Sequence, residues 1–292
     1  MGCAPHSISA GPFTLEFGAR TLLMGIINVT PDSFSGDGIG ADPAAAAEQA
    51  VEFAAAGADI IDVGGESTRP GAERVSAEEQ IRRTEPAVRA IARAVSRPIS
   101  IDTTRAEVAA AALDAGAHII NDVSALREDP ALARLAAERQ APVVLMHMLG
   151  TPATMQADPR YEDVVRDVRA FLAERIRAAM EAGIAEERIL IDPGIGFGKT
   201  VEHNLEILRR LSDFRALGRP ILVGTSRKSM IRRILGTESQ SEVVWGTAAT
   251  VACAIRNGAD VVRVHDVAEM AAVAKVADAI CRSRAQAGRR AT

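Results

Sequence analysis

The sequence predicts a (β/α)₈ barrel, in which eight parallel strands alternate with eight helices. Its 292 residues suit this fold, which typically needs about 250 residues. Hydrophobic residues make up 48% of the chain but aromatic residues only 3%, so the core must be built from small and branched aliphatic side chains. A repeated strand-entry pattern is the third observation. Together these features favour an α/β fold in one domain of residues 1–292, with a core of about residues 13–280.

The repeated pattern joins a helix to the strand that follows it. Residues 56–61 read AGADII, residues 115–120 read AGAHII and residues 257–262 read NGADVV. In each, a glycine can end the helix in the left-handed conformation, and a β-branched run begins three residues later. Such short connections, repeated along the chain, are typical of a parallel sheet that is covered by helices.

Eight short apolar runs are the predicted strands, and turn signals separate them. They cover residues 22–29, 59–63, 98–102, 119–123, 142–146, 189–192, 220–224 and 260–265. Asp-Pro pairs at 42–43 and 129–130 predict helix starts. Capping pairs are predicted at Ser76/Glu79, Thr104/Glu107 and Asp266/Glu269.

The two ends of the chain are expected to lie outside the barrel proper. Residues 13–20 predict an extended arm or hairpin around Gly18 that closes the bottom of the barrel, and residues 284–292 predict a frayed tail. A doubly wound sheet is the alternative fold. It would need a glycine-rich phosphate turn after the first strand, where this chain has Asn28-Val29-Thr30-Pro31.

Composition limits the partners and the location of the protein. The net charge of −4 argues against nucleic-acid and membrane-surface partners. The three cysteines form no metal-binding or disulfide pattern and fit a reducing compartment. Without a signal-peptide pattern or a long apolar run, we expect a cytoplasmic protein that binds small molecules.

Polar residues end nearly every predicted strand. Because the carboxyl ends of barrel strands meet at one opening, these side chains are expected to form a site there. They are Asn28, Glu66, Asp102, Asn121, Asp122, His147, Asp192, Ser226, Arg263 and His265.

Several of these residues predict an anion site. Arg263 and His265 are two apart on one strand, so both face the same side, where an anion would compensate their charge. The alternative is an ion pair with Asp266 or Asp102. Ser226, at a predicted helix start, and nearby Lys228 suit a carboxylate or phosphate.

The other singled-out residues are weaker candidates. The run GIGFGKT at residues 194–200 fails as a phosphate-binding loop because its required first glycine would be Pro193. It is better interpreted as a glycine lip beside the pocket, with Phe197 as its bulky wall. His147 and His203 lack metal-ligand spacing and are expected to be structural.

Two long motifs and several short ones resemble the dihydropteroate synthases. The long motifs are MGIINVTPDSFS at residues 24–35 and DVGGESTRPG at residues 62–71; the shorter ones are SIDT at 100–103, DPGIGFGK at 192–199, SRKS at 226–229 and RVHD at 263–266. The resemblance covers about residues 13–280. It implies a homodimeric transferase that condenses 6-hydroxymethyl-7,8-dihydropterin pyrophosphate with p-aminobenzoate, giving 7,8-dihydropteroate and pyrophosphate.

The resemblance also implies the site residues, and four of them, Asp102, Lys228, Arg263 and His265, are implied to be catalytic. The pterin would contact Asp102, Asn121, Met146, Asp192, Phe197 and Lys228. The pyrophosphate would contact Asn28, Thr68, Arg69, Arg263 and His265, with Asn28 also on Mg²⁺. The p-aminobenzoate would contact Phe34, Thr68, Pro70, Phe197, Ser226 and Lys228.

The loops at residues 30–40 and 66–74 are expected to close over the substrates and to exclude water. Two alternatives remain open. One is a pterin-dependent methyltransferase of the same barrel type, which would need no pyrophosphate site. The other is a non-catalytic pterin-binding relative.

Overall fold

The computed structural model describes residues 7–30, 40, 42–67 and 74–282. Eight parallel strands form one sheet, with neighbours in the order β8-β7-β6-β5-β4-β3-β10-β9. They are β3 (Leu22–Asn28), β4 (Ile60–Gly64), β5 (Ile99–Asp102), β6 (Ile119–Asp122), β7 (Val143–Met146), β8 (Ile189–Asp192), β9 (Leu222–Val223) and β10 (Val261–Val264). A bridge between Ile191 and Ile221 links β8 to the segment that leads into β9 and closes the barrel. The predicted barrel is therefore confirmed, and each predicted strand coincides with an observed one.

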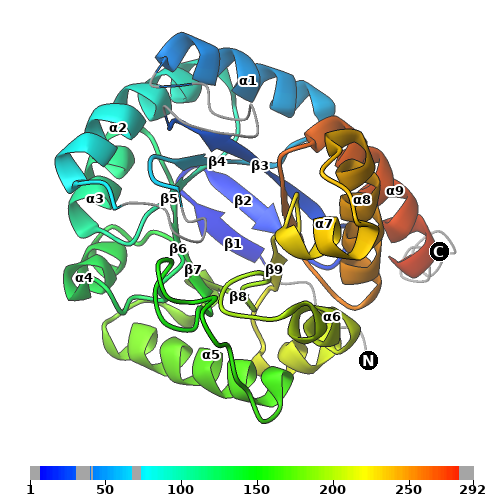
Figure 1. Cartoon of the computed structure of the whole chain (residues 1–292). Coiled ribbons are helices and arrows are strands. Elements are labelled where there is room, and N and C mark those ends of the chain that lie inside the picture. The colour runs from blue at the N-terminus through cyan, green and yellow to red at the C-terminus, as the bar shows by residue number, and fades with distance from the viewer. Residues whose placement is uncertain (1–6, 31–39, 41, 68–73, 283–292) are drawn as a thin grey trace, which may run out of the picture.

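Helices ring the strands on the outside, as Figure 1 shows. They are α1 (Pro43–Ala56), α2 (Ala77–Ala94), α3 (Ala106–Ala115), α4 (Pro130–Glu138), α5 (Val164–Glu181), α6 (Val201–Arg209), α7 (Ser229–Leu235), α8 (Gln240–Arg256) and α9 (Val267–Arg282), with 3-10 turns at Glu186–Arg188 and Leu211–Leu217. The main core lies between the outer strand faces and these helices, and aliphatic side chains make up most of it. In the described part of the chain, no helix is both long and apolar enough to span a membrane.

The predicted helix starts are partly confirmed. Asp42 and Asp129 accept hydrogen bonds from the first turns of α1 and α4, and Ser76 caps α2 by accepting from the amide of Glu79. The Thr104/Glu107 prediction is wrong, because α3 begins after Arg105 and the Thr104 hydroxyl donates to Glu128 instead.

α9 begins at Val267, directly after Asp266, which agrees with the helix start predicted from the Asp266/Glu269 pair. The Asp266 carboxylate also forms an ion pair at 2.5 Å with Arg227 of the preceding βα segment.

A hairpin closes the bottom of the barrel, but its turn was misplaced. β1 (Ser7–Ala10) pairs with β2 (Phe13–Glu16) around Gly11, which has a φ of 58°, whereas Gly18 follows the hairpin. Residues 7–10 alternate polar and apolar side chains as an amphipathic strand does, so the hairpin begins before residue 13. Ile8 and Leu15 of the hairpin pack with barrel residues such as Met24 in an apolar cluster. The bottom of the barrel is thus sealed by apolar side chains.

Candidate active site

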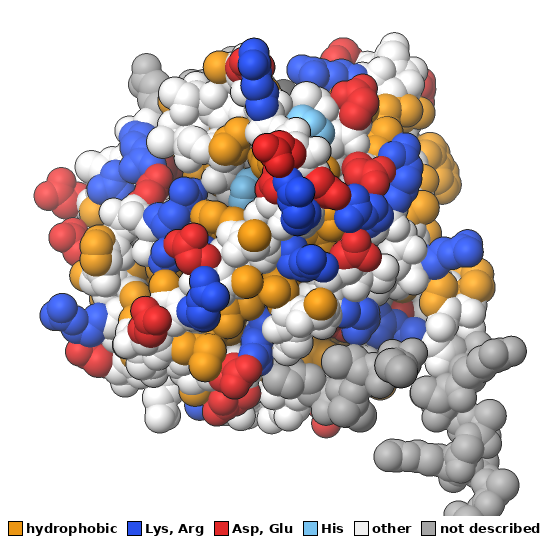
Figure 2. Space-filling model, turned by 90° about the horizontal axis from the view of Figure 1, so that it is seen from below, with side chains coloured by type: hydrophobic (Ala, Val, Ile, Leu, Met, Phe, Trp, Pro, Cys, Tyr) orange, Lys and Arg blue, Asp and Glu red, His pale blue; other side chains and the backbone are white. Residues whose placement is uncertain are grey.

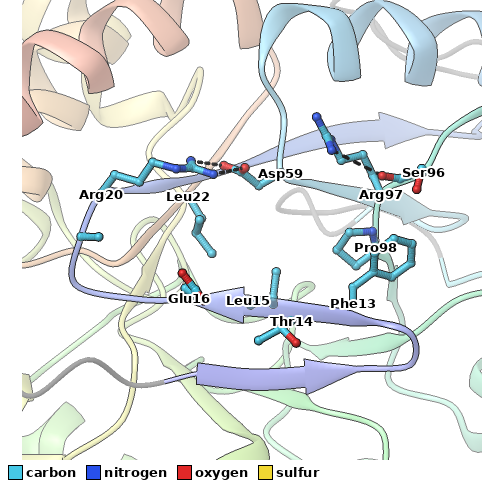
Figure 3. A pocket seen from close by; sticks show the side chains of 11 residues that line it. Phe13, Thr14, Leu15, Glu16, Arg20, Leu22, Asp59, Ser96, Arg97 and Pro98 are labelled. Atoms are coloured by element: carbon cyan, nitrogen blue, oxygen red, sulfur yellow. Dashed lines mark hydrogen bonds and ion pairs between the residues drawn. The ribbon is translucent and has the colours of Figure 1, made fainter.

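A cavity of about 360 Å³ lies at the bottom of the barrel, beside the hairpin. Both arginines that line the cavity are already paired (Figure 3): Arg20 donates to both Asp59 oxygens, at 2.5 and 2.7 Å. Arg97 donates to the backbone carbonyls of Ala58 and Ser96. The polar strand ends lie at the opposite opening, so this cavity is not the site that the sequence predicts.

The barrel interior changes from apolar to polar in one step along its strands. Ile60, Ile119, Leu190 and Val261 belong to the apolar cluster at the bottom of the barrel. Two residues further along the same strands stand Asp62, Asn121, Asp192 and Arg263. Because side chains two apart on a strand share a face, the polar set lies directly above the apolar cluster. The carboxyl end of the barrel therefore has a polar floor built from several strands.

An arginine between two aspartates forms the centre of this floor. Arg263 Nε lies 2.6 Å from Asp62 Oδ2, and Arg263 Nη2 lies 2.8 Å from Asp102 Oδ2. Asp62 is fully buried, and the second oxygen of its carboxylate, Oδ1, has no hydrogen-bond partner. The ion-pair alternative for Arg263 is thus what the structure shows, with Asp62 and Asp102 as the partners. A guanidinium has five N–H donors, so this pairing leaves further donors for a ligand.

Burial and charge shift the protonation of this group. Burial raises the pKa of Asp102 to about 7, although the positive charge of Arg263 opposes the shift, and the neighbouring Asp62 raises it further. For Arg263, burial works against the charged form, but Asp62 and Asp102 outweigh it and raise the pKa. The arginine therefore stays charged, while Asp102 can titrate near neutral pH.

Asp192 and Asn121 complete the polar floor, and both are buried. Asp192 Oδ1 accepts a hydrogen bond from the amide of Gly194 at 2.7 Å, and burial raises the pKa of Asp192 to about 6. The Asn121 side-chain amide lies 3.4 Å from Asp62 Oδ2. Acceptors and donors thus stand side by side, as recognition of a planar heterocycle with both kinds of group requires.

The predicted glycine lip, residues 194–198, forms one wall of the site. Gly194, Gly196 and Gly198 all have φ between 65° and 83°, where only glycine is unstrained. Phe197 packs with Met146 in a small apolar cluster, and Lys228 Nζ lies 4.0 Å from the centre of its ring. Phe197, Met146 and Lys228 therefore share one side of the site.

Ser226 and His265 lie together at the opening. Ser226 Oγ lies 3.0 Å from His265 Nδ1 and accepts a hydrogen bond of 3.1 Å from the backbone amide of His265. Ser226 was predicted to lie at a helix start, but α7 begins three residues later, at Ser229. The hydroxyl is therefore positioned by β10 rather than by the helix.

The two histidines expected to be structural have structural contacts. His203 forms a capping box with Thr200 at the start of α6. His147 is buried, and its Nδ1 lies 2.9 Å from Lys199 Nζ.

Four predicted ligand contacts, Phe34, Thr68, Arg69 and Pro70, lie outside the described residues. Two residues of the site were not predicted from the sequence: Asp62, which pairs with Arg263, and Lys199, which donates to the glycine lip. Asp62 gave a usable signal, since it is the one charged residue in an otherwise apolar strand. Lys199 gave none, because its role depends on the shape of the lip.

The described residues hold no cluster of three or more His, Cys, Asp or Glu side chains suited to a metal ion. Asn28 ends β3 beside Gly64, where a Cβ would come within 3.6 Å of Asn28 Oδ1 and 3.9 Å of Asp102 Oδ2. The lack of a side chain at Gly64 keeps this space open. Mg²⁺ typically takes one or two protein oxygens and completes its shell with water and substrate phosphates, so Asn28 fits such an ion only together with a phosphate ligand.

Comparison with known proteins gives consistent matches. Residues 24–265 match the family model described as "Pterin binding enzyme". The dihydropteroate synthase of a Synechocystis species is 48% identical over 278 residues, which cover 95% of this chain and 96% of that protein. The Yersinia pestis dihydropteroate synthase in a sulfonamide complex has a TM-score of 0.90 at 41% identity, covering 94% of this chain and 98% of that one. The Xanthomonas albilineans dihydropteroate synthase with 4-aminobenzoic acid has a TM-score of 0.87 at 42% identity, covering 95% and 98%.

Proposed function

The chain belongs to the pterin-binding enzyme family, and we propose that it catalyses the dihydropteroate synthase reaction. In this reaction, 6-hydroxymethyl-7,8-dihydropterin pyrophosphate and p-aminobenzoate give 7,8-dihydropteroate and pyrophosphate. One observation carries the proposal most directly: Asp102, Asn121, Asp192 and Arg263 occupy the last or last-but-one position of four strands and form a single polar floor above an apolar cluster. The identity to named synthases, over nearly their whole length, supports the same activity.

The pterin ring is proposed to lie on this floor. Ionised Asp192 would accept N–H groups from the amidine-like edge of the ring, and Lys228 would donate to the ring carbonyl. Asn121 would pair with the remaining edge. Met146 and Phe197 would cover the apolar faces of the ring, consistent with their place in one buried cluster.

The diphosphate is proposed to bind at the same end of the barrel, near Arg263, His265 and Asn28. Arg263 has N–H donors beyond those that Asp62 and Asp102 occupy. Asn28 would hold Mg²⁺, with the remaining ligands supplied by the diphosphate and water. Such an ion would neutralise charge on the leaving group. Thr68 and Arg69, outside the described residues, remain predicted contacts of the diphosphate.

In the chemical step, the bond between the pterin methylene and the diphosphate oxygen breaks, and the aniline nitrogen forms the new bond. The electron pair of the broken bond leaves with the pyrophosphate, and the nitrogen loses one proton. Positive charge develops on the methylene as the pyrophosphate leaves. Ionised Asp102 would stabilise that charge, because a fixed carboxylate in a buried site needs no reorganisation.

The p-aminobenzoate carboxylate is proposed to meet Ser226 and Lys228 at the opening. His265 holds Ser226 in place through two contacts, so the hydroxyl is oriented before a ligand arrives. Phe197 would contact the aromatic ring. Phe34, Thr68 and Pro70, all outside the described residues, remain predicted contacts of this substrate.

The direct test measures pyrophosphate release from the full chain with Mg²⁺. Release should require both substrates, and omission of p-aminobenzoate should leave only slow hydrolysis. A non-catalytic relative would release no pyrophosphate above a no-enzyme control. A methyltransferase would instead transfer a methyl group from methyltetrahydrofolate and would ignore p-aminobenzoate.

We further propose a homodimer, formed through the outer faces of α8 and α9. Trp245 of α8 and Val276 and Ile280 of α9 are 75%, 61% and 75% exposed. The two helices pack against each other, and exposed apolar side chains gathered on neighbouring elements, unlike scattered ones, mark interaction surfaces. Light scattering on the wild type should give twice the mass of one chain. Trp245→Asp combined with Ile280→Lys should give the single-chain mass, and an unchanged dimer would place the interface elsewhere. A cytoplasmic location also remains a prediction.

A further inference from the structure

A buried lysine beneath the glycine lip has no part in the mechanism above. Lys199 is 3% exposed. Its Nζ lies 2.9 Å from the Gly194 carbonyl, 3.0 Å from the Phe197 carbonyl and 2.9 Å from His147 Nδ1. The two carbonyl acceptors carry no charge, and His147 is neutral because burial lowers its pKa to about 2. An ammonium group has three donors, so one side chain satisfies acceptors from two different segments.

The two segments that Lys199 joins both carry residues of the pterin site. His147 directly follows Met146 at the end of β7, whereas Gly194 and Phe197 belong to the lip. Gly194 also donates its amide to Asp192. The lip therefore connects Lys199 to the carboxylate and the ring that are proposed to meet the pterin.

The lip has one backbone hydrogen bond of its own, from the Phe197 amide to the Gly194 carbonyl at 3.1 Å, and depends otherwise on contacts from outside. Three of its five residues are glycines, which lose the most conformational entropy when they are fixed. A Cβ at Gly194 would come within 1.9 Å of the His147 carbonyl oxygen, so the lip lies directly against the end of β7. Side chains outside the lip must therefore fix its conformation, and among the residues that contact it Lys199 is a buried charged one.

The charge of Lys199 is costly at this position. Burial lowers the pKa of Lys199 to about 7, with Lys228 adding to the effect and Asp192 opposing it. An uncharged side chain would fill the space at less cost but would leave the three acceptors without a shared donor.

We propose that Lys199 is a positioning residue for the pterin subsite, holding the lip against His147 and thereby fixing Asp192 and Phe197 for the pterin. The inference rests on the proposed function, because it concerns the same pterin subsite. Lys199 acts through the lip and does not contact the substrate.

The test uses the full chain and the bare hydroxymethyl pterin as the probe. Lys199→Met keeps the length of the side chain but removes the donors. Tyr161→Phe is the matched control, since it removes a 2.7 Å hydrogen bond to the Gly198 carbonyl, at the end of the same lip that is further from Asp192. Calorimetry well below both melting temperatures should show pterin affinity at least about tenfold lower in Lys199→Met, as for a lost charge-assisted bond. Tyr161→Phe should stay within about threefold, since the bond that it removes is a neutral one.

Steady-state kinetics give a second measurement, the ratio of the two KM values, which would not change if Lys199 were merely structural. In Lys199→Met, the KM for the pterin pyrophosphate should rise more than the KM for p-aminobenzoate. If Lys199→Met melts lower but binds pterin as the wild type does, the lysine is only structural and the inference is wrong. If Lys199→Met does not fold, Lys199→Gln takes its place with the same two outcomes. Failure of the wild type to bind pterin would instead overturn the proposed function.

Discussion

Arg263→Ala should destabilise the protein in a strongly pH-dependent way. The substitution leaves Asp62, which is fully buried, and Asp102, whose side chain is 11% exposed, without their shared cation. Removing one partner of a buried ion pair typically costs about 3–5 kcal/mol. For a chain of this size, about 2 °C of melting temperature is lost per kcal/mol, so a drop of roughly 6–10 °C is expected at pH 8.

The same cost should shrink as the pH falls. Protonation of the stranded Asp102 carboxyl removes one of the uncompensated charges. The pKa of Asp102 is already raised to about 7, and Arg263 is a group that opposes this rise, so its loss moves the value higher still. The difference in unfolding free energy between Arg263→Ala and the wild type should therefore narrow as the pH falls. It narrows by up to about 1.4 kcal/mol per pH unit for each proton that the folded variant binds and the folded wild type does not.

Thermal unfolding at pH 8 and pH 5.5 measures this gap. The control is Arg20→Ala, which removes an arginine that donates both of its bonds to a single aspartate. Arg20 is 57% exposed, so a loss of about 1 kcal/mol or less is expected at both pH values. A gap for Arg263→Ala that is equally large at both pH values would show that lost packing, rather than stranded charge, causes the destabilisation. That result would refute the electrostatic reasoning for the polar floor.

Three further predictions concern ligands and protonation. Asp192→Asn should abolish pterin binding in calorimetry, because it places a donor opposite ligand N–H groups; normal binding by a folded variant would show that Asp192 is structural. Burial raises the pKa of Asp192 to about 6 from 3.8, so its protonated form stabilises the folded state below pH 4, and that stabilisation is lost as the pH rises through 6. In denaturant unfolding, the unfolding free energy of Asp192→Asn relative to that of the wild type should therefore be roughly 2–3 kcal/mol higher at pH 7 than at pH 4. The same relative value at both pH values would contradict the burial argument. Labelled p-aminobenzoate should bind in equilibrium dialysis only when pterin pyrophosphate, or pyrophosphate with Mg²⁺ and a pterin, is present; equal binding to the empty protein would contradict closure of the predicted loops.

The barrel could be predicted because local signals agree with one another along the chain. The Gly-Ala strand entries, the apolar runs and the caps at Asp42, Asp129 and Ser76 each indicate the same βα repeat. The positions of Asp102, Asn121 and Asp192 at the ends of predicted strands also indicated that they share one site. Period-two alternation places their side chains on the inner face of the barrel. Strand and helix signals are local, and this is why they can be interpreted from sequence.

What could not be predicted depends on contacts between distant segments. The pairing of Arg263 with Asp62 joins residues at opposite ends of the chain, and no local pattern indicates which carboxylate an arginine will choose. Lys199 donates to carbonyls whose direction is set by left-handed glycines. The hairpin turn lies at Gly11 and not near Gly18. The alternation that marks its first strand is only four residues long, which makes it a weak local signal.

The surface reflects the near-neutral composition. On the face shown in Figure 2, Lys and Arg side chains are interspersed with Asp and Glu side chains rather than gathered into a patch of one sign. Association steered by long-range charge is therefore not favoured on that face.

The order of strands in the sheet has a consequence for synthesis on the ribosome. β3, the first strand of the barrel, pairs with β4 on one side and with β10, the last strand, on the other. Thr21, just before β3, is likewise bound by Asp278 of α9. While the chain emerges, the growing sheet carries an open edge on β3 that is hydrogen-bonded only after residues 261–264 appear. During translation this edge is open to pairing with other nascent chains. The synthesis of α8, β10 and α9 therefore both completes the barrel and removes this site of aggregation.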